Sequence, residues 1–415
     1  MDLFATDMDL HTYPIALVRI GNLYKSMGRY LEAEYYFKKT IEYCEMNNNM
    51  PVYASAIGSI GLLYFIMEDY DHAEFYYLKV IESCNSFFQN LNRETIYWIH
   101  RLGLNYSRKG DFINALNSLQ YSFNSFKYLF LSSMNYMTEY QRECYWMTMQ
   151  NYFEYSYPSF SYKYHFADDS ISTFAYNNEL FVKGLLLNSS ESVKRSIIES
   201  NDTILIRQWN ELTTKKQQIQ VLQEKEPQSN YLKQIEAEAE QLEKQITRSS
   251  AAFREHQAMW QITWDSVRNH LSPNEVAIEY FSAPLSEDST MYCALFLRHD
   301  SEHPEMIPLF EQKEITSFMS FSSPTITNQT YDFYGNGDTI SQLIWSKILP
   351  KINESETIYF APSGLLHQLA IEYLPYDEER TMSDVYNMVR LSSTREIVMN
   401  KPQLQNTTAT IYGGI

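Results

Sequence analysis

Nucleophilic chemistry needs a thiol or hydroxyl beside an imidazole. In this 415-residue chain, the cysteines and histidines are the residues that could supply such a pair. The four cysteines, Cys44, Cys84, Cys144 and Cys293, are too widely spaced for a zinc or dithiol motif. Cys293 alternates with apolar neighbours in a predicted strand and lacks the glycine-flanked loop that would expose a nucleophile. We therefore predict four reduced and mostly buried thiols.

The remaining candidates lie close to predicted strand ends. His299 and His303 follow the Cys293 strand in a polar turn, where solvated side chains are expected. Ser363 and Gly364 follow another strand, but the Gly-x-Ser-x-Gly pattern of a nucleophile elbow is absent, which favours a simple turn. His367 is the most attractive imidazole of the set. No metal-ligand spacing and no phosphate-binding glycine loop is present, so we predict no catalytic residue, no metal and no cofactor.

Composition limits the partners and the location. Asp and Glu total 51 against 33 for Lys and Arg, and the net charge of -18 repels nucleic acid and anionic lipid. The most apolar stretches, 128–134 and 180–187, are far shorter than the roughly 20 residues of a membrane span, and the first residues lack a basic signal region. We expect a cytoplasmic protein. With 34 tyrosines and 12 glycines, we expect helix to dominate.

The elements that would position any site begin with an internal repeat. Gly21, Gly61 and Gly103 bring four further columns into register. These columns are aromatic after three (Tyr24, Tyr64, Tyr106) and nine residues (Tyr30, Tyr70, Phe112), alanine after twelve (Ala33, Ala73, Ala115) and bulky after sixteen (Phe37, Tyr77, Leu119). Small residues on two helices allow close approach while large ones fill the gaps, so the columns predict antiparallel helix pairs.

The pattern resembles the tetratricopeptide repeat over about residues 12–127, with turns at Gly28 and Gly110. The glycines lie 40 and 42 residues apart, more than the usual repeat of about 34, which implies longer second helices. A generic helical bundle with tyrosine-rich core faces is the alternative. We assign residues 1–127 to about three such repeats, forming an α-helical solenoid.

The resemblance implies a concave face, lined by the first helix of each pair, that binds a protein or peptide. Applying the family's inner positions predicts partner contacts at Asn22, Lys25, Leu62, Phe65, Tyr97, His100, Leu104 and Arg108. Only Asn22 matches the Lys/Asn clamp that some relatives use for C-terminal carboxylates, so that ligand is not supported. The oligomeric state cannot be inferred from the residues.

The middle of the chain remains helical in period. Residues 128–202 read as closing helices and a linker, with an N-cap at Asp168–Ser170 for a helix to about Leu187. Residues 203–262 read as a long helical hairpin joined at Pro227, with an apolar seam typical of a coiled coil. The hairpin is interpreted either as a lever or dimerisation arm, or as a spacer packed on its neighbours.

Beyond Ser272 the apolar period shifts towards 2, with strands predicted at 276–281, 292–297, 357–361 and 408–412 and a helix at about 339–350. This alternation predicts an α/β domain with a mostly parallel sheet. Residues 263–415 are assigned to it.

Several segments of this region resemble the CHAT domain. The motifs are TIYFAPSGLLHQLAIEYLP (357–375), YNMVRLSSTREIV (386–398) and ATIYGGI (409–415), preceded by YNNELFVKGLLLNSS (176–190) and WDSVRNHLSPNEVAIEYF (264–281). The resemblance implies a caspase-like fold related to cysteine peptidases. The family's catalytic His and Cys follow the Tyr-Gly-Gly signature at which this sequence ends, so the domain is expected to be incomplete and His367 structural.

Two hypotheses follow. In the first, the chain is the N-terminal portion of a repeat-regulated CHAT cysteine peptidase and is inactive as it stands, because it lacks the catalytic pair. In the second, it is a binding protein or scaffold whose caspase-like part is degenerate. Both assign protein binding to the repeats.

Overall fold

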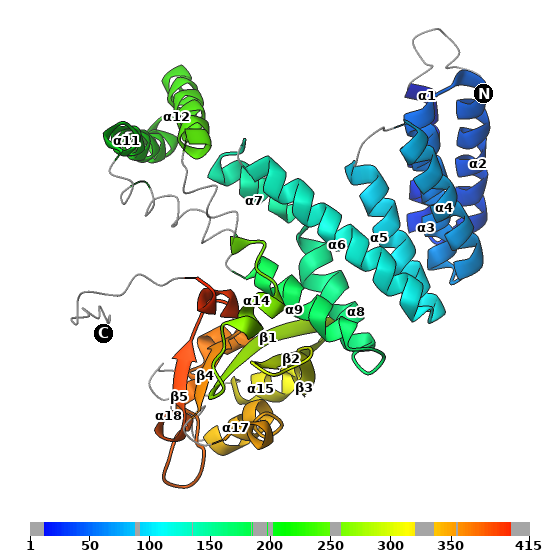
Figure 1. The fold of residues 1–415 in the computed structure, drawn as a ribbon. Helices are drawn as coiled ribbons and strands as arrows, with labels where there is room; N and C mark the ends of the chain where they lie inside the picture. The colour runs from blue at the N-terminus through cyan, green and yellow to red at the C-terminus, as the bar shows by residue number, and fades with distance from the viewer. Residues whose placement is uncertain are drawn as a thin grey trace. The chain divides into compact units, whose positions relative to one another are not determined.

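The structure is a computed structural model that describes residues 12–87, 92–134, 136–183, 185, 197, 202–249, 259–319, 336–353 and 356–399. The chain divides into two compact units, Met1–Ser133 and Met134–Ile415. The first is helical, and the second combines helices with a sheet (Figure 1). The segments 408–412 and 409–415, for which a strand and a signature were predicted, lie outside the described residues.

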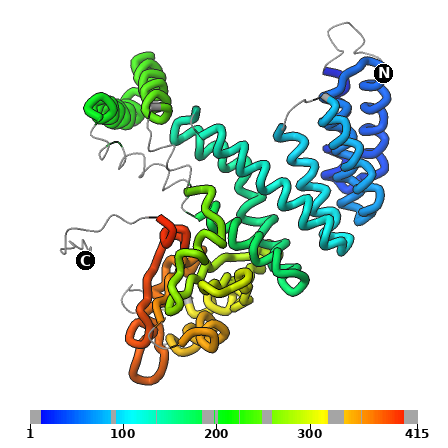
Figure 2. The backbone as a smooth tube through the Cα atoms, viewed as in Figure 1, coloured from blue at the N-terminus to red at the C-terminus, as the bar shows by residue number. Residues whose placement is uncertain are grey.

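The first unit consists of successive antiparallel helix pairs, as the repeat columns predict (Figure 2). Its helices are α1 (Thr12–Ser26), α2 (Tyr30–Asn47), α3 (Met50–Ile66), α4 (Tyr70–Phe87), α5 (Arg93–Lys109) and α6 (Phe112–Met134). The second helices are the longer partners, in agreement with the stretched repeat. Helix α6 continues beyond residue 127, where the sequence placed the end of the array.

The repeat glycines allow the two helices of each pair to approach closely. A Cβ on Gly61 would lie 2.9 Å from the ring of Tyr77, and one on Gly103 would lie 2.9 Å from Leu119. The alanine column is fully buried at Ala33 and Ala73. Each glycine therefore faces the bulky residue sixteen positions later, which is the physical origin of the pattern.

The turns within the pairs use the left-handed backbone region. Gly28 and Gly110 have φ of 71° and 80°, where a side chain would be strained. Glu68 takes the same place in the middle pair with φ of 61°. This turn was not predicted, because it lacks glycine.

Neighbouring repeats are joined by the same hydrogen bond at two junctions. Tyr64 of α3 donates to Glu34 of α2 at 2.7 Å, and Tyr106 of α5 donates to Glu74 of α4 at 3.1 Å. The junctions are thus copies of one another.

The second unit begins with four described helical segments. They are α7 (Glu139–Met147), a π-helix (Tyr152–Ser156), α8 (Tyr157–Lys163) and α9 (Ser170–Val182). Of these, the π-helix, α8 and α9 contact the sheet. A helical hairpin follows, formed by α11 (Thr203–Lys225) and α12 (Asn230–Ser249). Its seam is buried as predicted, for example at Leu212 and Ile235. Glu243 of α12 accepts from the backbone N–H of Glu139 at 2.8 Å, which ties the hairpin to the start of α7.

The sheet has five strands in the order β3-β2-β1-β4-β5. They are β1 (Glu275–Ser286), β2 (Ser289–Arg298), β3 (Glu305–Glu311), β4 (Thr357–Ala361) and β5 (Asn387–Arg390). The pairs β1–β4 and β4–β5 are parallel, whereas β2 pairs antiparallel with both β1 and β3, so the sheet is mixed. The prediction of a mostly parallel sheet was therefore wrong: β1 and β2 form a hairpin whose turn, Glu287 and Asp288, has no glycine, and β3 and β5 were missed.

Helices cover both faces of this sheet. On one face, α17 (Gly337–Trp345) packs Ile340, Ile344 and Trp345 against alternate residues of β1 and β4. On the other face lie α9 and α14 (Trp264–Asn269). Among the described residues, none of the helices is both long and apolar enough to cross a membrane.

Candidate functional site

The predicted partner-binding residues lie on the first helix of each pair, and together they define the inner face. Asn22 and Lys25 are on α1, Leu62 and Phe65 on α3, and Tyr97, His100, Leu104 and Arg108 on α5. Most are half-buried, Arg108 is exposed, and His100 is only 1% exposed. The buried imidazole is therefore part of the interior in this structure and does not reach the surface.

On the inner face, Arg101 and Phe65 of neighbouring first helices are in contact, and Lys25 of α1 lies near enough to be affected by the Arg101 charge. Arg101 of α5 lies over the ring of Phe65 on α3, with 5.4 Å from its guanidinium carbon to the ring centroid. Lys25 of α1 donates to Asn22 at 2.8 Å. Burial lowers the pKa of Lys25, and the nearby charge of Arg101 lowers it further. Arg101 was not among the predicted residues, although its half-buried position on α5 places it with them.

His100 is a buried residue whose pKa is strongly shifted. Burial lowers the pKa of His100 to about 3, and the Arg101 charge adds to the effect. The imidazole is therefore neutral at physiological pH. Its contribution is to packing rather than to acid–base chemistry near pH 7.

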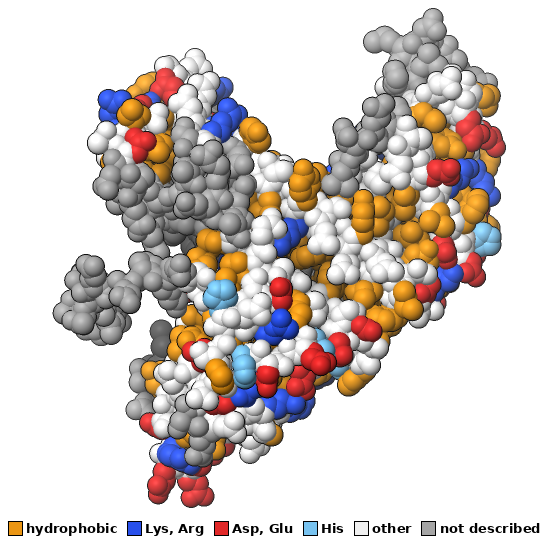
Figure 3. Space-filling view, in the orientation of Figure 1, with side chains coloured by type: hydrophobic (Ala, Val, Ile, Leu, Met, Phe, Trp, Pro, Cys, Tyr) orange, Lys and Arg blue, Asp and Glu red, His pale blue; other side chains and the backbone are white. Residues whose placement is uncertain are grey.

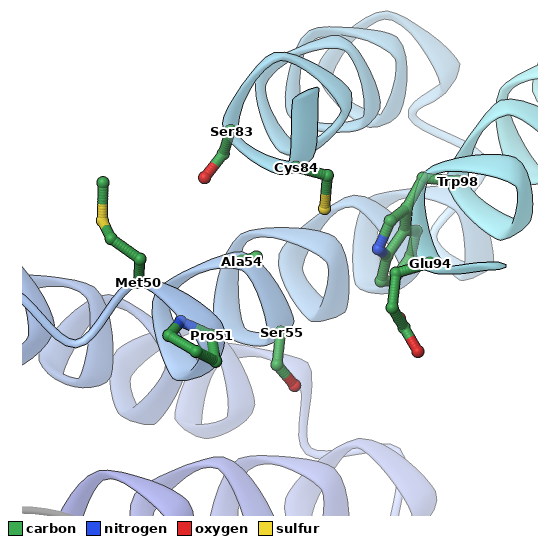
Figure 4. A pocket seen from close by; sticks show the side chains of 8 residues that line it. All are labelled: Met50, Pro51, Ala54, Ser55, Ser83, Cys84, Glu94 and Trp98. Carbon is green, nitrogen blue, oxygen red and sulfur yellow. The ribbon is translucent and has the colours of Figure 1, made fainter. Parts of the chain in front are cut away.

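A cavity of about 360 Å³ lies between the first turns of α3 and α5 and the end of α4 (Figure 4). Its walls are mainly apolar, and they include Met50, Pro51, Ala54, Cys84, Glu94 and Trp98. The indole of Trp98 occupies the space that a Cβ on Gly58 would need. Trp98 stands at the repeat position that Ala16 and Ala56 occupy in the first two repeats. The absence of a side chain on Gly58 leaves room for this large ring.

The second helices of the repeats expose several apolar side chains. Leu31 is 79% exposed, Tyr35 60% and Phe75 59%. Apolar side chains are scattered among polar ones over these helices in the space-filling view (Figure 3). Single exposed apolar residues are ordinary on protein surfaces, so the inner face, with its clustered cations and rings, is the stronger candidate.

The second unit does not assemble a nucleophile and base from the described residues. Cys293 is fully buried in β2, and burial raises the pKa of its thiol far above the usual range, as expected for a core residue. His303 pairs with Asp169 at 2.9 Å. His367 lies in a 3-10 turn (Gly364–Gln368), and its pKa is lowered by burial and by the charges of Lys183 and Arg390.

A buried polar cluster lies beside the middle of β1, where Glu279 pairs with the end of β4, and is called the polar hub. Its members are Lys183, Glu279, Ser393, Thr394 and Arg395. Glu279 of β1 is fully buried, and accepts from Ser393 Oγ at 3.0 Å and from the Thr394 N–H at 2.9 Å. Lys183 Nζ lies 3.5 Å from Glu279 and donates to the Ala361 carbonyl at 2.8 Å. The hub thereby joins β1, the end of β4 and the segment after β5.

Arg395 links the hub to helix α9. Its guanidinium donates to the Leu180 carbonyl at 2.6 Å and to the Lys183 carbonyl, so it caps the C-terminal end of α9, where a cation is favourable. It also lies 4.0 Å over the ring of Trp260. Described residues of four motifs take part in this cluster or its contacts: Leu180 and Lys183, Glu279, Ala361, and Ser393 to Arg395.

No group of three or more His, Cys, Asp or Glu side chains within the described part of the chain could hold a metal ion. The tetratricopeptide repeat family model matches residues 12–86, which span the first two helix pairs. Residues 12–86 are a tetratricopeptide-repeat region. No curated protein matches this chain. The CHAT resemblance of the second unit rests on its motifs alone.

Proposed function

We propose that the repeat unit binds a protein or peptide partner on its inner face. The match to tetratricopeptide repeats supports this, because such repeats generally bind proteins. The decisive observation is the proximity of Lys25, Phe65 and Arg101, since clustered rings and cations are the side chains enriched where proteins associate. The predicted inner-face residues other than the buried His100 are the proposed contacts.

The test uses the full tagged chain as bait, and compares inner-face with outer-face variants. Leu62→Gln and Leu104→Gln change half-buried inner side chains, while Leu31→Gln is the matched outer-face control. A partner retained by the control and lost by both inner-face variants, with unchanged circular dichroism, supports the proposal. Equal retention by all three variants, or no captured protein, contradicts it.

A second candidate function concerns the α/β unit, which we propose to be a CHAT-like, caspase-like domain. The mixed sheet covered on both faces, and the meeting of the motif segments at the polar hub, favour it. The resemblance implies a peptidase in a form that carries the catalytic pair, and a degenerate scaffold is the alternative.

The peptidase question has a direct readout. The chain is expected to leave casein intact, with or without a captured partner, because Cys293 is buried and Cys144 is the exposed thiol without a motif. Cleavage abolished by Cys144→Ala or Cys293→Ala would contradict this and identify a nucleophile. A longer product of the parent gene with a His-Gly strand end and a later Cys strand end should cleave, and failure to do so favours the scaffold.

A further inference from the structure

Several cations of the repeats are paired with carboxylates. Lys38 lies 2.7 Å from Glu34, and Arg29 pairs with Glu32. Lys109 bridges Asp71 at 2.7 Å and Glu74 at 2.6 Å. This is the expected outcome in a chain with 51 acidic and 33 basic residues, since a carboxylate is usually within reach.

Lys25 and Arg101, the two central cations of the inner face, lack such a carboxylate partner in the part of the chain that the structure describes. No carboxylate among the described residues forms an ion pair with Lys25 or Arg101, as the ion pairs that involve the repeats lie elsewhere. Burial lowers the Lys25 pKa, and the charge of Arg101 nearby lowers it further. Two like charges are thus held near one another at a half-buried position, an arrangement that costs free energy without a ligand.

Arg101 is partly engaged inside the unit. Its guanidinium rests on Phe65, and its Nε is buried without a hydrogen-bond partner within the described chain. Burial raises the pKa of Tyr77, and the charge of Arg101 and a side-chain hydrogen bond with it partly offset this effect. An arginine stacked on a ring keeps its planar edge available for an acceptor, and a carboxylate fits that edge with two parallel hydrogen bonds. Leu62 and Phe65 provide apolar surface beside it.

Arg108 stands apart from this pair. It lines a cleft with Asp69 and Asp71 at the turn between α3 and α4, so carboxylates of the chain already surround it. Lys25 and Arg101 have no comparable carboxylate partners among the described residues of the inner face.

Resting on the proposed function, we infer that the partner presents an acidic segment, whose side-chain carboxylates pair with Lys25 and Arg101 while an apolar side chain packs at Leu62 and Phe65. Charge complementarity selects this occupant. A basic segment would add a third positive charge at the site, and the net charge of -18 disfavours a nucleic acid. The complex neutralises the two cations and supplies an acceptor for Arg101.

The probe is a rhodamine-labelled peptide of repeated Glu-Glu-Leu with an amidated C-terminus, titrated with the full chain by fluorescence anisotropy. Its Gln-Gln-Leu counterpart should bind at least about tenfold more weakly, which corresponds to about 1.4 kcal/mol. Lys25→Glu and Arg101→Glu should each weaken the acidic peptide by about tenfold or more. Lys38→Glu, which reverses a paired outer cation, should change it less than about threefold.

Arg101→Gln provides a milder variant in case the reversed charge disturbs folding, and circular dichroism monitors the helices. Equal binding of the two peptides, equal losses in inner and outer variants, or no binding of the acidic peptide would each overturn the inference. Binding that requires a free C-terminal carboxylate would overturn the assignment to side chains. If Leu62→Gln loses the captured partner but Lys25→Glu retains it, the proposed partner binding stands. The inference that the partner presents an acidic segment is then wrong.

Discussion

The repeat unit and the α/β unit are held together in opposite ways. The repeats reuse one design, in which a glycine faces a bulky residue within each pair and a tyrosine–glutamate hydrogen bond joins neighbouring pairs. The α/β unit instead depends on a single buried cluster, where Glu279, Lys183 and Arg395 join segments that are distant in sequence. Stability is shared among copies in the first and concentrated in the second.

This difference has a consequence for mutation. In a repeat array, each contact supports mainly its neighbours, so losses should be local and nearly additive. In the hub, one change leaves other buried charges without partners, so a single loss should spread through the unit. Substitutions in the hub should therefore destabilise the protein more than substitutions in the repeats.

The largest effect is expected for Glu279→Gln. It leaves the ammonium of Lys183, whose side chain is 7% exposed, without its carboxylate, and should destabilise the α/β unit by about 3–5 kcal/mol. Chemical denaturation measures the loss. Hydrogen exchange should increase across α9, β1 and residues 392–398, but not across α1–α4.

Glu305→Gln is the matched control, because the pair of Glu305 with Lys351 is exposed and should contribute no more than about 1 kcal/mol. Adding Lys183→Met to Glu279→Gln removes the stranded charge and should restore part of the stability. If Glu279→Gln loses no more stability than Glu305→Gln, the stability of the α/β unit is not concentrated in the hub.

The two units should also respond to pH in opposite directions. Burial raises the pKa of Glu179 on α9 to about 7, so the folded unit retains a proton that the unfolded chain releases above pH 4.5. This contribution is complete below pH 4.5 and is lost as pH rises through 7. The lowered pKa of His100 acts in reverse: its contribution is complete above pH 6.5 and is lost as pH falls towards 3.

Calorimetric unfolding of the full chain between pH 4 and 8 should reveal both slopes, each at most about 1.4 kcal/mol per pH unit. Glu179→Gln, which mimics the protonated acid, should flatten the α/β slope alone, and His100→Asn the repeat slope alone. If either variant leaves its slope unchanged, the assignment of that slope is wrong.

A smaller effect is expected for Gly58→Ala. The new methyl group would overlap the indole of Trp98, and the overpacking should cost about 1–3 kcal/mol despite the better helix propensity of alanine. Thermal unfolding of the repeat unit measures it. In a Trp98→Ala background the clash is absent, so the same substitution should stabilise the helix by up to about 1 kcal/mol. A loss in both backgrounds would contradict the steric explanation.

The smallest effects are expected at the repeat junctions. Tyr64→Phe and Tyr106→Phe each remove one hydrogen bond to a carboxylate and should cost about 1 kcal/mol, because the groups are partly exposed. The double variant should lose the sum of the two within about 0.5 kcal/mol. Strong coupling between the junctions would mean that the repeats behave as one cooperative block.

The same contrast explains what the sequence could predict. The repeat helices follow from columns separated by 3, 9, 12 and 16 residues, all inside one helix pair, and residues such as Gly61 and Tyr77 meet as their spacing implies. Strand β4 was also located correctly at Thr357–Ala361. Local patterns carry this information.

Features that depend on distant partners were not predictable in this way. Strand β5 has four residues without clear alternation, and β3 contains Pro308. Nothing near Glu279 signals a contact with Thr394, which lies 115 residues further along the chain. On the inner face, Arg101 was not predicted, because the inner positions of the family correspond to neighbouring residues such as His100. Its contact with Phe65 is seen only in the structure.

The cap that Arg395 provides for α9 also sets an order of events during synthesis. The carbonyl of Leu180 emerges from the ribosome 215 residues before the guanidinium that completes its helix end. At about 5–20 residues per second, the nascent helix waits roughly 10–40 seconds for its cap. The repeats need no such delay, so they can be folded and ready to meet a partner while the sheet is still being translated.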